Sequence, residues 1–281
     1  MESCDLVEVD LETIPTHVPA ERVVWHGGPL VRDVRQVPEE QAIAITYNGS
    51  THAVMMASPS DFEDFAIGFS LTERIIRAPE DVRSLEIVAF GSGIEARLWI
   101  DDERAKRLSQ RRRALAGPTG CGLCGVDSLS EALPEIAEIP ASDLKVTPAE
   151  IMLAINALSE KQPLFAETHA VHAAGFWMPE KGLVAAREDL GRHNAMDKLV
   201  GALKRQNVDV RSGIATITSR ISVEIVQKAA ILGVPILVAV SAPTSLAIKT
   251  AEKAGLTLIG VARRDGFEAF THTGRIDFGA A

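Results

Sequence analysis

Cys121 and Cys124 are the residues of this chain best suited to chemistry. They are three positions apart in a stretch rich in glycine, Thr119-Gly120-Cys121-Gly122-Leu123-Cys124-Gly125. The thiolate is the reactive form of cysteine, and its population rises where cations lie nearby. Because glycine-rich loops usually lie at the surface, we expect these two thiols to be exposed rather than buried and inert.

The CxxC spacing is compatible with three kinds of chemistry. A zinc site would need two more ligands, and His169 and His172 could supply them as an HxxH pair. They follow a strand-like run, however, in which residues three apart point to opposite faces. Thioredoxin-type exchange fits less well, because its CxxC opens a helix after a strand, whereas here a basic helix comes first. A mobile, electropositive pair fits a persulfide carrier, a nucleophile that accepts sulfur and hands it on.

A basic segment lies just before the cysteine pair. It places six cations in ten residues: Arg104, Lys106, Arg107, Arg111, Arg112 and Arg113. On an exposed helix, such a run is often only a solvated face. The functional alternative is that the cations attract an anionic partner or cofactor and activate Cys121.

The composition excludes several classes of protein. With 281 residues, 46% of them hydrophobic and 24% charged, the chain is an ordinary globular protein of one large or two small domains. A net charge of −9 disfavours nonspecific nucleic-acid binding. Three cysteines indicate a reducing compartment. The start lacks a signal peptide, and the longest apolar runs have the length of a strand, so we expect a cytoplasmic protein without membrane contact.

Local signals divide the chain into four parts. They are a disordered lead-in at 1–20, a small α+β domain at 21–116, the CxxC loop and connector at 117–147, and an α/β domain at 148–281. In the second part, Asn48-Gly49 predicts a tight hairpin between strands at 42–47 and 52–56, since both residues tolerate positive φ.

A helix is expected to follow over 59–76, where Ser60 and Glu63 have the spacing of a capping box. The remaining elements of the small domain are strands at 85–89 and 94–100 and the basic helix at 103–116.

Strands and helices alternate in the last part of the chain. A helix is expected from Thr147 onward, because a cap, a proline and a glutamate follow one another there. Later helices are predicted at 194–205, 223–232 and 244–254, between strands at 165–177 (with a break allowed), 183–187, 214–218, 236–240 and 256–261. The last strands are continuous apolar runs, as expected for a parallel sheet covered on both faces. The fold class is therefore α/β.

The carboxyl ends of these strands carry polar residues. Ligands of open parallel sheets bind beyond those ends. The segments there are Ser219-Arg220, Ser241-Ala242-Pro243-Thr244 and Arg263-Arg264-Asp265-Gly266. Hydroxyls, guanidiniums and a helix N-terminus at one edge favour a phosphate or nucleotide site, although the serines and Thr244 could equally be helix caps. A GxGxxG after a strand and a Walker loop are both absent from the sequence.

Residues 187–194 form a further polar cluster between a strand and a helix. Asp189 or Asn194 could be the N-cap of that helix. His193 could be a proton donor, although a lone histidine is more often a structural hydrogen-bonding group.

Together these segments resemble FdhD/NarQ, the formate dehydrogenase accessory sulfurtransferase family, from about Ala42 to His272. The resemblance rests on several motifs in order: Thr46-Tyr47-Asn48-Gly49 with Met55-Met56, Asp64-Phe65-Ala66-Ile67-Gly68-Phe69, Arg112-Arg113-Ala114-Leu115-Ala116-Gly117 before Gly120-Cys121-Gly122-Leu123-Cys124-Gly125, Glu188-Asp189-Leu190-Gly191-Arg192-His193-Asn194-Ala195, Thr218-Ser219-Arg220 and Val238-Ala239-Val240-Ser241.

The resemblance implies a function. Members of this family pass persulfide sulfur from a cysteine desulfurase to the molybdenum bis(molybdopterin guanine dinucleotide) cofactor that formate dehydrogenase requires. The carrier is the first cysteine of the pair, Cys121 here, and Cys124 is its companion. The family implies no catalytic metal of its own, and it implies a homodimer. Its C-terminal half resembles the three-layer sandwich of cytidine deaminases, without the zinc.

The family's cofactor contacts match the segment after the last predicted strand. We expect them at Val261, Ala262, Arg263, Arg264, Asp265 and Gly266, with Ser219 and Arg220 beside them. Family members tend to have glycine early and arginine late in this segment, whereas this chain has Arg264 early and Gly266 late. The alternative function is a non-catalytic chaperone for the molybdenum cofactor, with a structural metal at the CxxC.

Overall fold

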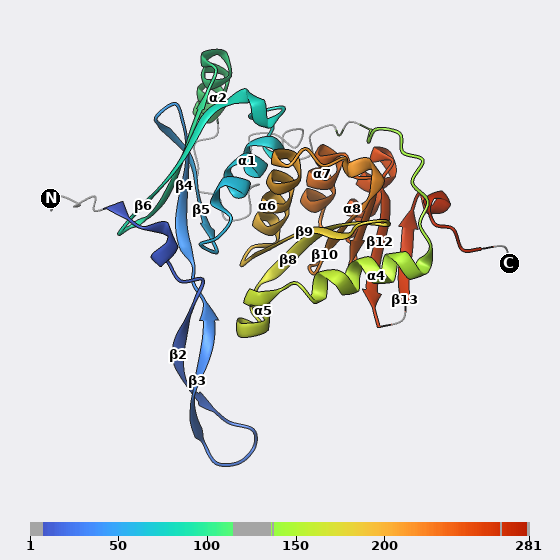
Figure 1. Cartoon of the computed structure of the whole chain (residues 1–281), viewed down its shortest axis with the longest axis horizontal. Coiled ribbons are helices and arrows are strands. Elements are labelled where there is room, and N and C mark those ends of the chain that lie inside the picture. The colour runs from blue at the N-terminus through green and yellow to red at the C-terminus, as the bar shows by residue number, and fades with distance from the viewer. Residues whose placement is uncertain (1–7, 115–135, 137, 265, 280–281) are drawn as a thin grey trace.

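Two β-sheets enclose a shared layer of helices in this chain (Figure 1). The computed structural model describes residues 8–114, 136, 138–264 and 266–279. In this part of the chain the N-terminal sheet has the strand order β1-β6-β7-β4-β5, and the C-terminal sheet has the order β13-β12-β11-β10-β8-β9. No helix in these ranges is long and apolar enough to cross a membrane.

The N-terminal sheet confirms the predicted hairpin at Asn48-Gly49 and the two predicted strands that follow α1 (Phe62–Thr72). Its strands are β1 (Glu8–Val9), β4 (Gln41–Tyr47), β5 (Ser50–Ala57), β6 (Val82–Phe90) and β7 (Gly93–Ile100). Asn48 and Gly49 join β4 to β5 with φ of 48° and 77°. The side-chain amide of Asn48 also accepts from the N–H of Ile100 at 2.8 Å and donates to its carbonyl at 3.1 Å. This turn therefore ties β4 to the end of β7.

The predicted helix at 59–76 is α1 (Phe62–Thr72), but its N-terminus differs from the prediction. The N-cap is Asp61, which has φ of 53° and makes no side-chain cap bond. Ser60 accepts instead from the Nζ of Lys198 at 3.4 Å. The capping box was wrong because these polar side chains make tertiary contacts. Phe65 and Phe69 of this helix are buried in the core.

The expected disordered lead-in is wrong for residues 8–20. β1 pairs with β6, and β2 (His17–Val24) pairs with β3 (Val31–Pro38) in a hairpin of its own. This hairpin projects from the body of the molecule in Figure 1. This hairpin was not predicted, although Gly27-Gly28 is a dipeptide typical of hairpin turns and has valines on both sides. Residues 1–7 lie outside the described part.

The C-terminal sheet is mixed, with a parallel centre. Its strands are β8 (His172–Met178), β9 (Gly182–Asp189), β10 (Ile214–Ile217), β11 (Ile236–Ala239), β12 (Thr257–Arg263) and β13 (Gly266–Thr271). As predicted, β10, β11 and β12 are parallel, and every residue of β10 and β11 is buried. β8 and β13 run antiparallel to their neighbours, and β13 was not predicted.

The predicted strand at 165–177 is wrong in its first half. The chain there forms α5 (Pro163–Thr168), followed by β8. Proline opens α5 at its first turn, and His169 ends it with φ of 53°. An N-terminal proline favours a helix, and a left-handed residue ends one. The apolar residues of this run suited either element.

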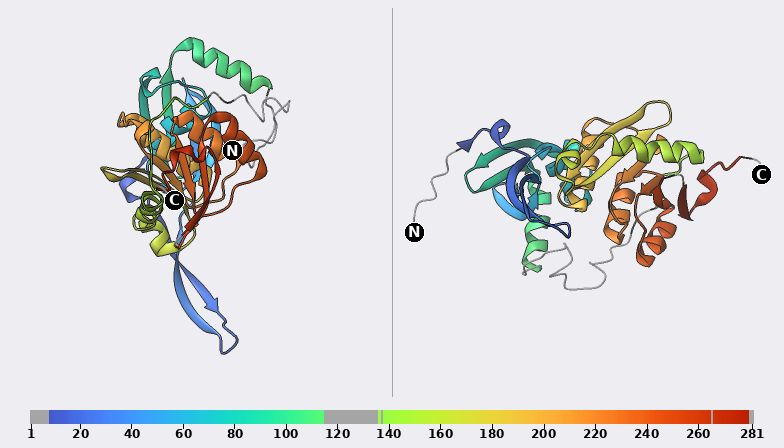
Figure 2. Two further views of the ribbon diagram at one scale, coloured as in Figure 1. Left: turned by 90° about the vertical axis from the view of Figure 1, so that its right-hand side faces the viewer. Right: turned by 90° about the horizontal axis from the view of Figure 1, so that it is seen from below.

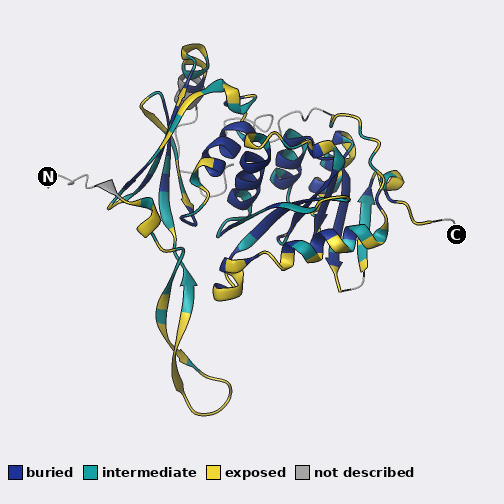
Figure 3. Ribbon diagram, viewed as in Figure 1, coloured by how far each residue is buried: buried dark blue, intermediate teal, exposed yellow. Residues whose placement is uncertain are grey.

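Helices cover both faces of the C-terminal sheet. α6 (Arg192–Arg205), α7 (Val223–Leu232) and α8 (Ser245–Ala254) form one layer, and α4 (Pro148–Ser159) lies on the opposite face (Figure 1). This is a three-layer α/β sandwich, as predicted. The buried residues of Figure 3 run from its sheet through the helix layer to the N-terminal sheet. A single apolar cluster accordingly contains Ile43 of β4 and Leu237 of β11.

α1 and α6 join the two halves of the molecule. They pack closely through Gly68 and Gly201, where a Cβ atom would overlap the backbone of Asp197 and Asp64, respectively. Buried ion pairs supplement this contact. Lys228 of α7 reaches both carboxylate oxygens of Asp197 at 2.6 and 2.7 Å. The same lysine donates to Thr72 of α1 at 3.1 Å.

Candidate functional site

One edge of the C-terminal sheet gathers most of the polar residues predicted to bind a ligand. β9, β10, β11 and β12 share one direction, because β9 and β10 are both antiparallel to β8. Their carboxyl ends therefore lie at a common edge, and α6, α7 and α8 begin there. In open α/β sheets this is the edge at which ligands bind.

Backbone hydrogen bonds hold the loops of this edge together. The N–H of Ile221 donates to the carbonyl of Ala242 at 3.3 Å, and the N–H of Thr244 returns to Ile221 at 3.0 Å. The N–H of Val261 donates to Ser241 at 3.2 Å. The three predicted segments, after β10, β11 and β12, are thus neighbours in space. Their adjacency was inferred from topology and is confirmed.

The turn between β12 and β13 has an unusual backbone. Val261 has φ of 54° and Arg264 has φ of 61°, and the strand register shifts between Gly260 and Arg263. Positive φ in a β-branched residue is strained and persists only where its surroundings impose it. Ala262 is buried, whereas both arginines and Gly266 are exposed. Asp265 lies outside the described residues.

The hydroxyl groups at this edge have different roles. Thr244 is the N-cap of α8, and its Oγ1 accepts from the N–H of Ala247 at 3.2 Å. Ser219 is buried and donates to the carbonyl of Arg220 at 3.1 Å. The capping alternative therefore holds for Thr244 but not for Ser219. Arg220 itself is exposed, so it adds a third guanidinium to this edge.

Residues 187–194 lie at the same edge, between β9 and α6. The N-cap of α6 is Gly191, so neither Asp189 nor Asn194 has the predicted capping role. Asp189 instead forms an ion pair with Lys198 at 2.7 Å, with both side chains fully buried. Asn194 donates to Asp189 at 3.0 Å and to the carbonyl of Met56 at 2.9 Å. These residues bind the end of β5 to α6.

His193 is the one titratable side chain of this segment whose pKa is strongly perturbed. Burial lowers its pKa to about 4, and the nearby cations Arg192 and Lys228 act in the same direction. The imidazole is therefore neutral at pH 7, which argues against an imidazolium proton donor. Among the described residues, neither its Nε2 nor the buried Nε of Arg192 has a hydrogen-bond partner.

The histidines of the zinc alternative occupy different elements. His169 ends α5, and His172 begins β8. Burial and the charge of Arg192 lower the pKa of His172. Within the described ranges, no three metal-binding side chains converge. Cys121 and Cys124 lie outside the described residues, as does Cys4.

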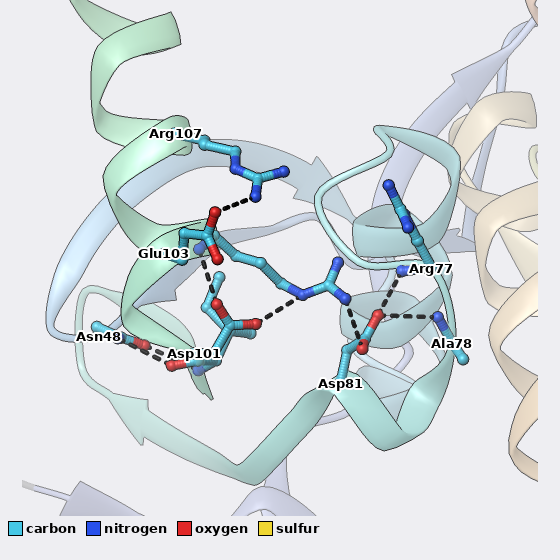
Figure 4. Close-up of polar contacts among 9 residues, drawn as sticks. Asn48, Arg77, Ala78, Asp81, Asp101, Glu103 and Arg107 are labelled. Carbon is cyan, nitrogen blue, oxygen red and sulfur yellow. Dashed lines mark hydrogen bonds and ion pairs between the residues drawn. The ribbon is translucent and has the colours of Figure 1, made fainter.

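The basic helix is α2 (Asp102–Ala114), and part of its charge is neutralised (Figure 4). Arg104 bridges Asp101 at 2.7 Å and Asp81 at 2.8 Å. Arg107 pairs with Glu103 one turn away. These two cations anchor and stabilise α2, so they are poor candidates for activating a thiol. The side chains of Arg111, Arg112 and Arg113 lie outside the description.

The fold and the edge define an α/β protein with an arginine-rich edge at the carboxyl ends of its parallel strands. A sequence model of the FdhD/NarQ family matches residues 38–277. The chain belongs to the FdhD/NarQ family.

Named relatives support this assignment. The chain is 50% identical over 255 residues to the sulfur carrier protein FdhD of Agrobacterium fabrum, covering 91% of this chain and 94% of that one. It is 54% identical over 242 residues to the sulfur carrier protein FdhD of Brucella abortus, covering 86% and 90%. The crystal structure of a formate dehydrogenase accessory protein from Desulfotalea psychrophila superposes with a TM-score of 0.73 at 26% identity, covering 93% of this chain and all of that one.

Proposed function

We propose that this protein carries sulfur during the maturation of formate dehydrogenase. The observation that carries the proposal is its identity of 50% and more, over most of the chain, to proteins named as sulfur carriers. Cys121 and Cys124 are the residues whose chemistry suits that role. They are the one closely spaced thiol pair in the sequence, which has three cysteines.

The loading step is a thiolate exchange with a cysteine desulfurase. The thiolate of Cys121 attacks the terminal sulfur of the donor's persulfide, the donor's S–S bond breaks, and the donor leaves as a thiolate. Cys121 then holds the sulfur as its own persulfide. The electrons balance without an added oxidant or reductant, because the sulfur keeps its oxidation state.

Cys124 provides a balanced route for release. Its thiolate can attack the inner sulfur of the Cys121 persulfide, forming a Cys121–Cys124 disulfide and expelling hydrosulfide toward the acceptor. A thiol reductant then restores both cysteines. On this proposal, Cys121 is required for loading and Cys124 for turnover.

The acceptor is the molybdenum bis(molybdopterin guanine dinucleotide) cofactor, a substrate of the reaction. The edge described above suits its guanine dinucleotide groups, because exposed Arg220, Arg263 and Arg264 can pair with phosphates and the α8 N-terminus favours anions. Val261, Ala262, Asp265, Gly266 and Ser219 complete the proposed contact set.

Intact mass spectrometry tests the loading step. The protein is incubated with a cysteine desulfurase and cysteine, and we expect one added sulfur atom that a reductant removes. Cys121→Ala should abolish this addition, whereas Cys4→Ala is the matched control and should load normally. A fully loaded Cys121→Ala protein would refute the assignment. Absence of added sulfur in the wild type, together with stoichiometric zinc, would instead favour the cofactor chaperone.

A further inference from the structure

Two helix starts at the carboxyl edge of the C-terminal sheet hold polar side chains that the proposed function does not use. α6 and α7 lie side by side in the helix layer (Figures 1 and 2). Arg192 and His193 open α6, and Ser222 and Glu224 lie at the start of α7. We call these four residues the polar cluster. The N-caps of the two helices are Gly191 and Ser222, and neither makes a side-chain cap bond.

The four side chains influence one another electrostatically, so they lie close together. Burial lowers the pKa of His193, as do the charges of Arg192 and Lys228, whereas Glu224 on the neighbouring helix opposes them. Burial acts to raise the pKa of Glu224, but Ser222 and the charge of Arg192 help to lower it, so this carboxyl is ionised at neutral pH. The cluster therefore combines one cation, one carboxylate, a neutral imidazole and a hydroxyl.

The polar cluster is short of hydrogen-bond partners. Within the described part of the chain, four of its buried polar atoms make no hydrogen bond: Arg192 Nε, His193 Nε2, Ser222 Oγ and Glu224 Oε2. Buried polar atoms of folded proteins nearly always have a partner, and an exception calls for an explanation. The four residues as a whole are partly exposed, so the cluster is not sealed inside the core. A ligand that enters from the edge of the sheet would satisfy these atoms.

The mixture of charges selects the kind of ligand. A phosphate would meet the carboxylate of Glu224, and a metal cation would meet the guanidinium of Arg192, so neither fits the cluster. An uncharged group with N–H donors beside a carbonyl fits both charges, because its N–H groups pair with the carboxylate and its oxygen accepts from the guanidinium. Guanine and pterins share a ring edge with this pattern, the 2-amino-4-oxopyrimidine edge.

The polar cluster adjoins the arginines proposed above to pair with phosphates. Ile221, directly before Ser222, exchanges backbone hydrogen bonds with the loop after β11, and that loop accepts a bond from the N–H of Val261. β10 and β12 are two places apart in the sheet, which separates them by about 10 Å. A nucleoside diphosphate can span this separation, with its base at the cluster and its phosphates beside Arg263 and Arg264.

We propose that the polar cluster binds the 2-amino-4-oxopyrimidine edge of the acceptor cofactor. Glu224 accepts from the ring N–H and the amino group, and Arg192 donates to the carbonyl oxygen. The cofactor named above contains this edge twice over, in its guanine and in its pterin. The assignment rests on the proposed function, and it adds to that function the residues that select the base.

Calorimetry with matched nucleotides tests the cluster on the full chain. GDP carries the complete edge, IDP lacks the 2-amino group, and ADP has an amino group in place of the carbonyl. The wild type should bind GDP at least about tenfold more tightly than IDP and about a hundredfold more tightly than ADP, because each analogue leaves polar atoms of the site unpaired. This comparison requires no substitution, so it does not depend on the folding of a variant.

Variants of two glutamates assign the preference to the cluster. Glu224→Gln replaces one acceptor oxygen with a donor, so the affinity for GDP should fall at least about tenfold and approach that for IDP. Glu160→Gln is the matched control and should bind both nucleotides like the wild type, since Glu160 is exposed at the end of α4, on the opposite face of the sheet.

A free pterin separates the two sources of the edge. If the pterin is the ligand, 6-hydroxymethylpterin should bind the wild type and lose this binding in Glu224→Gln, while GDP and IDP bind alike. Equal binding of GDP, IDP and ADP, with no effect of Glu224→Gln on any of the four probes, would overturn the proposal and leave the cluster to ordered water.

Failure of the base site is distinguishable from failure of the proposed function. Arg263→Ala with Arg264→Ala should weaken GDP and IDP by the same factor, because both nucleotides carry the same phosphates. If this double variant has no effect while Glu224→Gln removes the preference for GDP, the base site stands and the phosphate site is wrong. If neither GDP nor the pterin binds the wild type, both are wrong. Sulfur loading of Cys121 should be unchanged in Glu224→Gln in every case.

Discussion

The buried ion pair between Lys198 and Asp189 should control the stability of the whole chain. Both side chains are fully inaccessible, and their N–O distance is 2.7 Å. Lys198 also donates to the carbonyl of Ser58 at 3.0 Å, and Asp189 accepts from the N–H of Ser58 at 3.0 Å and of Gly191 at 2.9 Å. The pair therefore holds the β5–α1 connection against the start of α6.

Lys198→Met removes the cation while nearly keeping its volume. It leaves the Asp189 carboxylate buried without a counter-charge, and breaking one side of such a pair typically costs about 3–5 kcal/mol. For a chain of this size that corresponds to a fall in Tm of roughly 6–20 °C. Chemical denaturation and differential scanning calorimetry would measure the two quantities.

Two further variants make this prediction specific. The double variant Asp189→Asn with Lys198→Met should lose less stability than the two single variants together, because it leaves no buried charge without a partner. Arg211→Ala breaks the exposed pair with Asp209, whose side chains are 57% and 56% accessible, and should cost about 0–1 kcal/mol. If Lys198→Met loses no more than Arg211→Ala, the reasoning from burial is refuted.

Three other predictions follow from the site and the core. The pKa of His193 lies at about 4 in the folded protein and near 6.5 when unfolded, so between these values only the unfolded state binds the extra proton. The stability of the folded protein should therefore fall as the pH drops from 6.5 toward 4. The denaturation midpoint of His193→Gln should decline less over that range than that of the wild type, and an equal decline would contradict this prediction. Gly201→Ala places a methyl group against the backbone of α1 and should lower the free energy of unfolding by about 1–3 kcal/mol or more. Gly274→Ala is the control and should be close to neutral, because the added methyl group meets no atom within 4 Å. Equal melting temperatures of the two variants would disprove the close helix contact. Arg263→Ala combined with Arg264→Ala should weaken GDP binding tenfold or more in calorimetry, since hydrogen bonds to charged groups are worth about 1.5–3 kcal/mol each. The double variant should still load sulfur. An unchanged affinity for GDP would place the nucleotide elsewhere.

Short sequence patterns predicted the secondary structure correctly where it depends on residues close together in the chain. Asn48-Gly49 predicted its hairpin because both residues tolerate positive φ. Gly233 and Gly255 end α7 and α8 in the left-handed conformation for the same reason. The apolar runs of β10, β11 and β12 identified the buried centre of the sheet, and parallel topology then brought Ser219, Ser241 and Val261 to one edge.

The amino-acid sequence alone was enough to predict the chemical candidates, the alternation of strands and helices, and the edge of the sheet at which the predicted binding segments meet. Tertiary structure decided what the polar residues at 58–61 and 187–198 do. Ser60 and Asn194 have the local properties of helix caps, but they serve contacts between segments far apart in the chain. It also neutralised Arg104 through Asp81, a partner 23 residues away. The contacts of Ser60 and Asn194 depend on how α1 and β5 pack against α6, and the Arg104–Asp81 pair depends on where α2 lies beside residues 79–81. No local pattern encodes either arrangement.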